Sequence, residues 1–139
     1  MTNDNAFRAI EQNDLTRVGP RAILICGFSV DIESAVRELL ARINAPDVPL
    51  IFCAEELLPL PLAEALTKDS PGTPVPANKL PPVMVLSGLT GQEIHGFLEQ
   101  FAATNLPRPI FAAATPANLT FSVKQLLAAL WQEQKARQT

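Results

Sequence analysis

The sequence predicts an α/β fold of two tandem βαβ(α) units, which form one four-stranded, mainly parallel sheet with helices on both faces. Four short runs are continuously apolar, as is typical of parallel strands buried on both faces. The first and third runs are each followed by a turn and then by apolar residues at helical spacing. In addition, a single offset aligns the two halves of the chain. The four runs span residues 22–26, 50–54, 83–86 and 110–114.

Length and composition predict a single folded domain. The chain has 139 residues, of which 47% are hydrophobic and 18% are charged. A chain of this size buries roughly two-thirds of its unfolded surface in one core. The net charge is −3 and the basic residues are scattered, so we expect neither nucleic acid nor a membrane surface as a partner.

The predicted location is the cytoplasm. Residues 1–13 lack the basic region and apolar run of a secretory signal. The longest apolar tracts, of about five residues, are far shorter than the ~20 residues needed to span a bilayer. Cys26 and Cys53 each stand at the end of an apolar run without C-x-x-C spacing. We expect both to be reduced core residues.

The helix starts are best specified in the second half, where a capping box and a hydrophobic staple occur twice. The pairs are Thr90 with Glu93 and Leu89 with Ile94 before the first of these helices, and Ser122 with Gln125 and Phe121 with Leu126 before the last. The last helix is expected to fray beyond Trp131, where the sequence turns polar. A short helix is expected to start near Pro61.

A proline-rich segment separates the two predicted repeats. Residues 67–82 are expected to form an extended connector, because their prolines exclude a regular helix or a central strand. The prolines are Pro71, Pro74, Pro76, Pro81 and Pro82. A weak amphipathic stretch around Phe7 and Ile10 is compatible with a short helix. The predicted division is a tail at 1–20 and a single domain at 21–139, made of repeat 21–66, connector 67–82 and repeat 83–139.

The predicted strand order depends on an internal repeat. Placing Gly27 on Gly88 gives an offset of 88 − 27 = 61 residues, which suggests a duplicated unit. One residue is then lost, so that residues 49–51 meet residues 109–111. Two such units joined edge to edge give strand order 2-1-3-4, and the two glycine turns are then expected side by side at the carboxyl ends of the central strands. Aligned pairs include Ser29 with Thr90, Val36 with Phe97, Leu40 with Phe101, and Asn44 with Asn105.

The second half resembles a known family. The residues that carry the resemblance are Ser87-Gly88-Leu89-Thr90, the string from Ala113 to Asn118 with its Thr-Pro-x-Asn, and the Leu126-Leu127 helix. Over roughly the last sixty residues the chain is similar to the bacterial family called domain of unknown function 3783. The first half has Glu55-Glu56-Leu57 where Thr115-Pro116-Ala117 would fall, so it looks like a diverged copy. The family has no assigned activity, and the resemblance implies a fold without a reaction.

Seven residues are candidates for binding a small anionic ligand. Glycines that end strands ahead of helices can offer backbone N–H groups to an anion. Each candidate also has a structural explanation as a turn glycine, a helix cap, a loop lock or a solvated lysine, and the G-x-G-x-x-G spacing of nucleotide sites is absent. The candidates are Gly27, Ser29, Gly88, Thr90, Thr115, Asn118 and Lys124.

Catalytic and metal-binding residues are scarce in the sequence. His95 is the only histidine, so we expect no metal site and no cofactor. Nucleophilic catalysis needs a base and an orienting acid beside the nucleophile. The candidates Ser29, Ser87 and Cys26 would have only His95 to recruit.

Three functional hypotheses follow. The leading one is a non-catalytic binding or regulatory module that engages a small anionic ligand or a partner protein. The alternative is a small enzyme that acts on an anionic substrate through Thr115, Asn118 and Lys124, or through the thiol of Cys26. The third is a homodimer, because an edge strand of a four-stranded sheet can pair across a two-fold axis.

Overall fold

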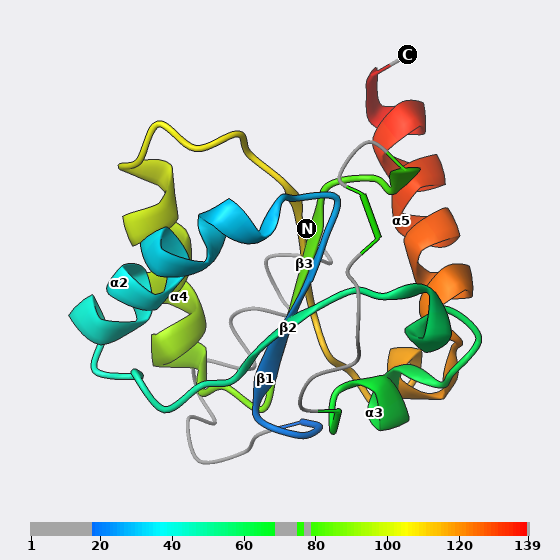
Figure 1. The fold of residues 1–139 in the computed structure, drawn as a ribbon, viewed down its shortest axis with the longest axis horizontal. Coiled ribbons are helices and arrows are strands. Elements are labelled where there is room, and N and C mark those ends of the chain that lie inside the picture. Colours follow the sequence, from blue (N-terminus) through cyan, green and yellow to red (C-terminus); the bar gives the residue numbers. More distant parts are fainter. Residues whose placement is uncertain (1–17, 69–74, 77–78, 139) are drawn as a thin grey trace.

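The computed structural model describes residues 18–68, 75–76 and 79–138 (Figure 1). The stretch around Phe7 and Ile10 lies outside these residues, as do residues 69–74 and 77–78 of the connector. In chain order the elements are β1 (Ala22–Cys26), the 3-10 helix η1 (Val30–Ile32), α2 (Glu33–Arg42), β2 (Leu50–Phe52), η2 (Glu55–Leu57), α3 (Leu62–Ala65), β3 (Val83–Ser87), α4 (Gly91–Ala102), β4 (Ile110–Ala113), η4 (Asn118–Thr120) and α5 (Val123–Gln138).

The four predicted strands are confirmed, with small differences at their ends. β1 has the predicted bounds, whereas β2 ends at Phe52 and β3 extends to Ser87. Every residue of β1 and β3 is buried, which explains why these runs are apolar throughout instead of alternating. The helix predicted near Pro61 is α3, which starts directly after that proline.

The strand order 2-1-3-4 is also confirmed. β1 pairs with β2, and β3 with β4, in parallel. The central pair differs from the expectation, because β1 and β3 run antiparallel with Ala22 opposite Ser87 and Cys26 opposite Val83. The sheet is therefore mostly parallel, with one antiparallel join between the two halves.

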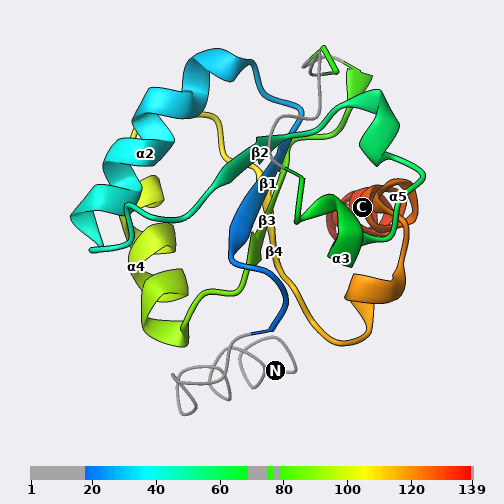
Figure 2. The ribbon, with the colours of Figure 1, turned by 60° about the horizontal axis from the view of Figure 1, so that its bottom comes forward.

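Two helical layers enclose the sheet. Helices α2 and α4 cover one face, while α3 and α5 cover the other (Figures 1 and 2). Alternate strand residues feed the two cores: Leu24 and Val85 pack on the side of α3 and α5, whereas Ile23 and Met84 pack on the side of α2 and α4.

The hand of strand crossovers accounts for the antiparallel join. In this strand order β2 lies to one side of the central pair and β4 to the other. A right-handed crossover is the strong preference for parallel strands. With parallel central strands it would place the two crossover helices on opposite faces, and with antiparallel central strands it places both on one face. Because α2 and α4 share a face (Figure 2), their packing requires the antiparallel arrangement.

The contacts between the halves have approximate two-fold symmetry. Leu24 lies opposite Val85, its equivalent at the offset of 61 residues. On the α3–α5 side, Pro61 bridges its own equivalent, Ser122. Reciprocal hydrogen bonds flank this bridge, from Leu62 N to Phe121 O at 2.8 Å and from Val123 N to Leu60 O at 2.9 Å. One axis through the middle of the sheet therefore relates the two halves.

The expected loss of one residue from the second half, between its helix and its second strand, is not observed. Ile23 is in register with Leu50, and Met84, its equivalent, is in register with Phe111. Leu50 therefore corresponds to Phe111 and not to Ile110, and the offset of 61 holds through the second strand of each half.

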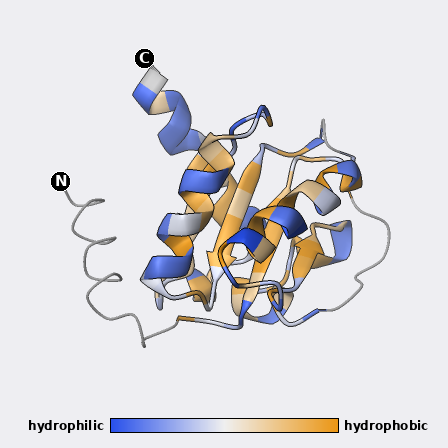
Figure 3. Cartoon of the chain, turned by 90° about the vertical axis from the view of Figure 1, so that its left-hand side faces the viewer, coloured by the Kyte–Doolittle hydropathy of each residue, from blue (hydrophilic) through white to orange (hydrophobic). Residues whose placement is uncertain are grey.

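Helix α5 is longer than expected. It continues beyond Trp131 to Gln138, and its hydrophilic last turns project from the body of the molecule (Figure 3). The intrahelical ion pair of Arg137 with Glu133, at 3.7 Å, supports these exposed turns. Over residues 18–68, 75–76 and 79–138, no helix has both the length and the apolar character that membrane crossing demands.

Candidate functional site

The two glycine turns lie at opposite ends of the central strands. This overturns the expectation that they form one crevice. Gly27 follows the end of β1 beside the start of β3, because Cys26 pairs with Val83. Gly88 follows the end of β3 beside the start of β1. The antiparallel join between the halves is the cause, since it turns the carboxyl ends of β1 and β3 away from each other.

Close approach of the chain explains both glycines. Gly27 and Gly88 have φ of +76° and +69°, a region that favours glycine. A β-carbon at Gly27 would lie 2.5 Å from the carbonyl oxygen of Pro81, and one at Gly88 would lie 2.5 Å from the Cα of Arg21. Both positions therefore require glycine because of the turn and of the backbone packed against it.

The segment that enters β1 covers the carboxyl end of β3. The Gly88 N–H donates to the carbonyl of Val18 at 2.9 Å. Gly19 packs so tightly that a β-carbon there would lie 2.6 Å from the Oγ of Ser87, and Ser87 is fully buried. The segment before β1 therefore covers the carboxyl end of β3.

The hydroxyls of Ser29 and Thr90 are engaged in helix caps. The Ser29 hydroxyl accepts from the N–H of Asp31 at 3.2 Å. Thr90 and Glu93 form the predicted capping box, with bonds of 3.1 Å and 2.9 Å. Both caps satisfy backbone N–H groups at the start of a helix.

Thr115 and Asn118 lock each other and the end of β4. The Thr115 N–H donates to the Asn118 Oδ1 at 2.8 Å, and the Asn118 N–H donates to the Thr115 Oγ1 at 3.0 Å. The Asn118 Nδ2 also donates to the carbonyl of Ala113 at 3.0 Å. The side chains of the Thr-Pro-x-Asn string thus close a loop, as the structural explanation predicts.

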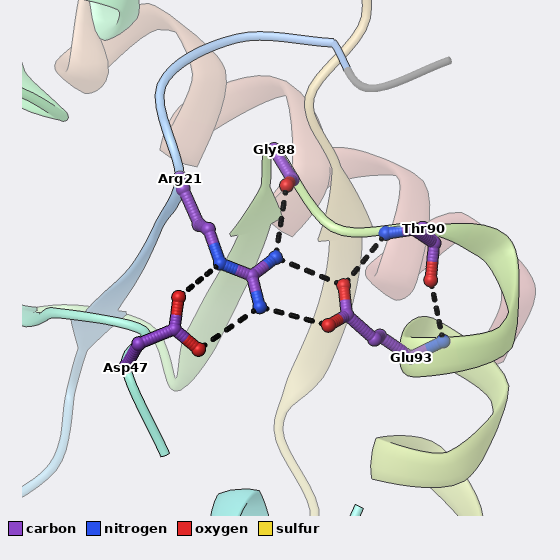
Figure 4. Close-up of polar contacts among 5 residues, drawn as sticks. All are labelled: Arg21, Asp47, Gly88, Thr90 and Glu93. Atoms are coloured by element: carbon purple, nitrogen blue, oxygen red, sulfur yellow. Dashed lines mark hydrogen bonds and ion pairs between the residues drawn. The ribbon is translucent and has the colours of Figure 1, made fainter. Parts of the chain in front are cut away.

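A polar cluster centred on Arg21 lies beside Gly88, at the carboxyl end of β3 (Figure 4). The sequence did not reveal it. The Arg21 guanidinium contacts Asp47 at 2.8 and 3.2 Å, Glu93 at 2.9 and 2.8 Å, and the Gly88 carbonyl at 3.3 Å. Hydrogen bonding to Glu93, and then to Asp47, raises the pKa of Arg21 above its ordinary value. We call these residues the Arg21 clamp.

The Arg21 clamp is a structural joint. The five hydrogen bonds match the five N–H donors of a guanidinium, so no donor is left for a ligand. They tie the start of β1 to the loop before β2 and to the first turn of α4. Arg21 and its partners are far apart in the sequence, and no short motif signals their contact.

Cys26 and Cys53 are buried and reduced, as predicted. They lie next to each other on β1 and just after β2, since Ile25 pairs with Phe52. A hydrogen bond to Cys53 and burial both raise the pKa of the Cys26 thiol well above 9.0. A protonated, 1% exposed thiol is a poor nucleophile.

Lys124 lies in the wall of an apolar groove, which we call the α5 groove. The groove has a volume of about 440 Å³, within the range of small ligand sites. Its lining residues are Leu58, Pro59, Leu80, Pro81, Lys124, Leu127, Ala128 and Trp131. Trp131 is 42% exposed. Lys124 is the only charged residue among the lining residues, and it makes no ion pair within the part of the chain described.

The predicted candidates therefore do not form one site. Gly27 and Ser29 lie at one end of the central strands, and Gly88 and Thr90 lie at the other end. Because β3 and β4 are parallel, Thr115 and Asn118 lie at the same end as Gly88. These six residues serve turns, caps and loop locks. Lys124 stands apart from them in the α5 groove, and among the described residues no group of His, Cys, Asp and Glu could hold a metal ion.

Fold and site thus define an α/β domain with an internal two-fold arrangement and an apolar groove. Residues 82–136 match the model of a family described as domain of unknown function (DUF3783), in agreement with the resemblance of the second half. No curated protein and no solved structure matches the chain. The match covers the second half alone, from just before β3 into α5.

Proposed function

We propose that this protein is a non-catalytic binding module whose α5 groove holds an apolar, carboxylate-bearing segment of a partner protein. The observation that carries the proposal is the position of Lys124, a single cation in the wall of a groove otherwise lined by apolar residues. An apolar segment would bury its side chains against Leu127 and Trp131 while its carboxylate pairs with Lys124.

The openness of the groove to solvent favours a peptide over a free small anion. A small ligand gains affinity when most of its surface is enclosed, but Lys124 is exposed and Trp131 is 42% exposed. A peptide needs only to anchor a few side chains, because the rest of its chain can remain in solvent. The net charge of −3 supports a protein partner over nucleic acid.

Tryptophan fluorescence provides the test, because Trp131 is the only tryptophan and lines the groove. A phage library of random twelve-residue peptides is selected on the immobilised full chain. Enriched peptides are expected to share apolar anchors and an acidic residue, and to shift the Trp131 emission to shorter wavelength when bound.

Two lysines of α5 supply a matched pair of variants. K124Q is expected to weaken binding of the selected peptides by about tenfold, the effect of losing one charge-assisted hydrogen bond. K135Q removes a charge from the exposed last turns of the same helix and should leave affinity unchanged. Failure to enrich any peptide, or binding that leaves Trp131 emission unaltered, would overturn the proposal.

A thiol-dependent enzyme receives no support from the geometry. Such a reaction needs an accessible thiolate beside a base. The raised pKa of Cys26 keeps its proton in place. The hydrogen bond with Cys26 lowers the pKa of Cys53, but Cys26 and Cys53 are only 1% and 2% exposed, so neither thiol is accessible to a substrate.

We also propose that the two halves descend from one duplicated unit, with the first half as the diverged copy. The offset of 61 residues relates Leu24 to Val85 and Pro61 to Ser122, and each pair is in direct contact. The bacterial origin of the resembling family and the reduced thiols of Cys26 and Cys53 support a bacterial, cytoplasmic protein.

A further inference from the structure

The outer edge of β4 carries backbone groups without partners in the described part of the chain. In a parallel ladder, alternate residues direct their N–H and C=O groups to the same neighbouring strand. The Ile110 N–H donates to Pro82 and the Ala114 N–H donates to Leu86. The intervening residues, Phe111 and Ala113, therefore direct their backbone groups away from β3.

Two local features limit which of these outward groups can bind another strand. Asn118 occupies the outward carbonyl of Ala113 with a bond of 3.0 Å. Pro109 also faces outward and has a carbonyl but no N–H. The remaining set consists of the Pro109 carbonyl, both groups of Phe111 and the N–H of Ala113.

The donors and acceptors of this set match those of an identical strand that runs antiparallel to it. We propose that β4 pairs antiparallel with β4 of a second copy of this chain, about a two-fold axis at Phe111. Each Phe111 then exchanges both backbone bonds with Phe111 of the second copy, and each Ala113 N–H donates to the Pro109 carbonyl of the second copy. Every outward group of the edge gains a partner, and the two sheets become one.

A longer foreign strand fits this edge less well. An antiparallel strand that extends past Ala113 would bring an N–H to a carbonyl that Asn118 already occupies. Past Pro109 it would bring a carbonyl to a residue without an N–H. Unmade backbone hydrogen bonds are costly when they are buried, so the edge favours a partner with the same interruptions, which a second copy has.

The surroundings of β4 leave the edge open. A hollow of about 850 Å³ lies along the strand between α4 and α5, and its walls include Leu98, Phe101 and Leu130. Phe111 is held by T-shaped contact with Phe101, with ring centroids 5.3 Å apart. Phe111 and Ala113 are half-buried and Pro109 is buried, but all three line the hollow, through which a second strand can reach them.

The other edge strand is less suited to this pairing. β2 has only three residues, and the connector reaches its end, where the Val75 N–H donates to the Cys53 carbonyl at 2.9 Å. The inference therefore concerns β4. It does not rest on the peptide proposed for the α5 groove, although Trp131 lines both that groove and the hollow along β4.

Sedimentation velocity of the full chain from about 1 to 100 µM tests the proposal. Wild type is expected to form a dimer that dissociates on dilution. A113P removes the outward N–H without touching a bond inside the sheet, and should weaken the dimer by at least about tenfold. A113V, of similar size, keeps the N–H and should dimerise as wild type does.

Hydrogen exchange of the wild type gives a second readout that does not depend on the folding of A113P. The amides of Phe111 and Ala113 should exchange slowly at high concentration and rapidly after dilution. A monomer at the highest concentration, a dimer that A113P leaves intact, or rapid exchange of both amides in the dimer would overturn the proposal.

Discussion

Arg21 shows how one side chain joins segments that the sequence keeps far apart. Its guanidinium lies between Asp47 and Glu93 and also binds the Gly88 carbonyl. Arg21 and Glu93 are largely buried, with 22% and 16% of their side chains exposed. Hydrogen bonds between charged groups contribute more than neutral ones, and the contribution grows as water is excluded.

Replacing Arg21 should therefore destabilise the fold. R21Q removes the guanidinium that binds Glu93 and Asp47, and we expect the free energy of unfolding to fall by about 2 kcal/mol. R37Q is the control, because Arg37 forms an exposed i,i+4 ion pair with Glu33, a contact worth only about 0.3–0.5 kcal/mol. Urea titration of both variants measures the difference. Equal losses would show that the Arg21 clamp adds nothing beyond a surface ion pair.

At the scale of elements, β1 and β2 bring two thiols together in the core. The Cys26 pKa is raised by the hydrogen bond to Cys53 and by burial. In the unfolded chain the thiol ionises near its ordinary pKa of 9.0, whereas the folded state keeps the proton. At Cys26 the folded state then binds more protons than the unfolded state, so the contribution of this thiol to stability decreases as the pH rises. The same hydrogen bond lowers the pKa of Cys53, which therefore loses its proton first.

The free energy of unfolding is thus expected to be unaffected by the Cys26 thiol below pH 9 and to fall above it, by up to about 1.4 kcal/mol per pH unit. C26A lacks the titrating group, so its stability should depend less on pH in that window. Denaturant titrations from pH 7 to 10 compare the two proteins. Parallel pH profiles for wild type and C26A would show that Cys26 ionises alike in both states.

The helices illustrate how much local sequence determines. The capping boxes at Thr90 and Ser122 form as predicted, with the Ser122 hydroxyl accepting from Gln125 at 3.1 Å. The expected fraying of α5 after Trp131 is wrong, because alternation of charge within a helix can sustain exposed turns. A polar sequence indicates exposure, and it does not by itself end a helix.

At the scale of the molecule, each half contributes to both cores. β3 pairs along its whole length with β1, and Leu62 and Val123 pack in the same core from opposite halves. A unit of about 60 residues buries only about 60% of its unfolded surface when it folds alone, and is correspondingly marginal in stability. Neither half has a complete core without the other.

A fragment of residues 79–139 should therefore fold only by self-association. Its β3 edge can pair with β3 of a second fragment about Val85, as β3 pairs with β1 in the full chain. Circular dichroism and sedimentation over a range of concentrations would follow folding and mass together. A fragment that is folded while monomeric would show that the second half is a domain in its own right.

Local patterns in the sequence specify which segments become strands and helices, where the helices start, and that the two halves have the same order of elements. These features depend on apolar periodicity and on caps, which act within a few residues. The direction of β3 relative to β1 depends instead on tertiary packing, because a parallel and an antiparallel join would bury the same apolar side chains, among them Leu24 and Val85. Packing of α2 and α4 on one face made the join antiparallel, and this separated Gly27 from Gly88 and left β4 at the edge of the sheet.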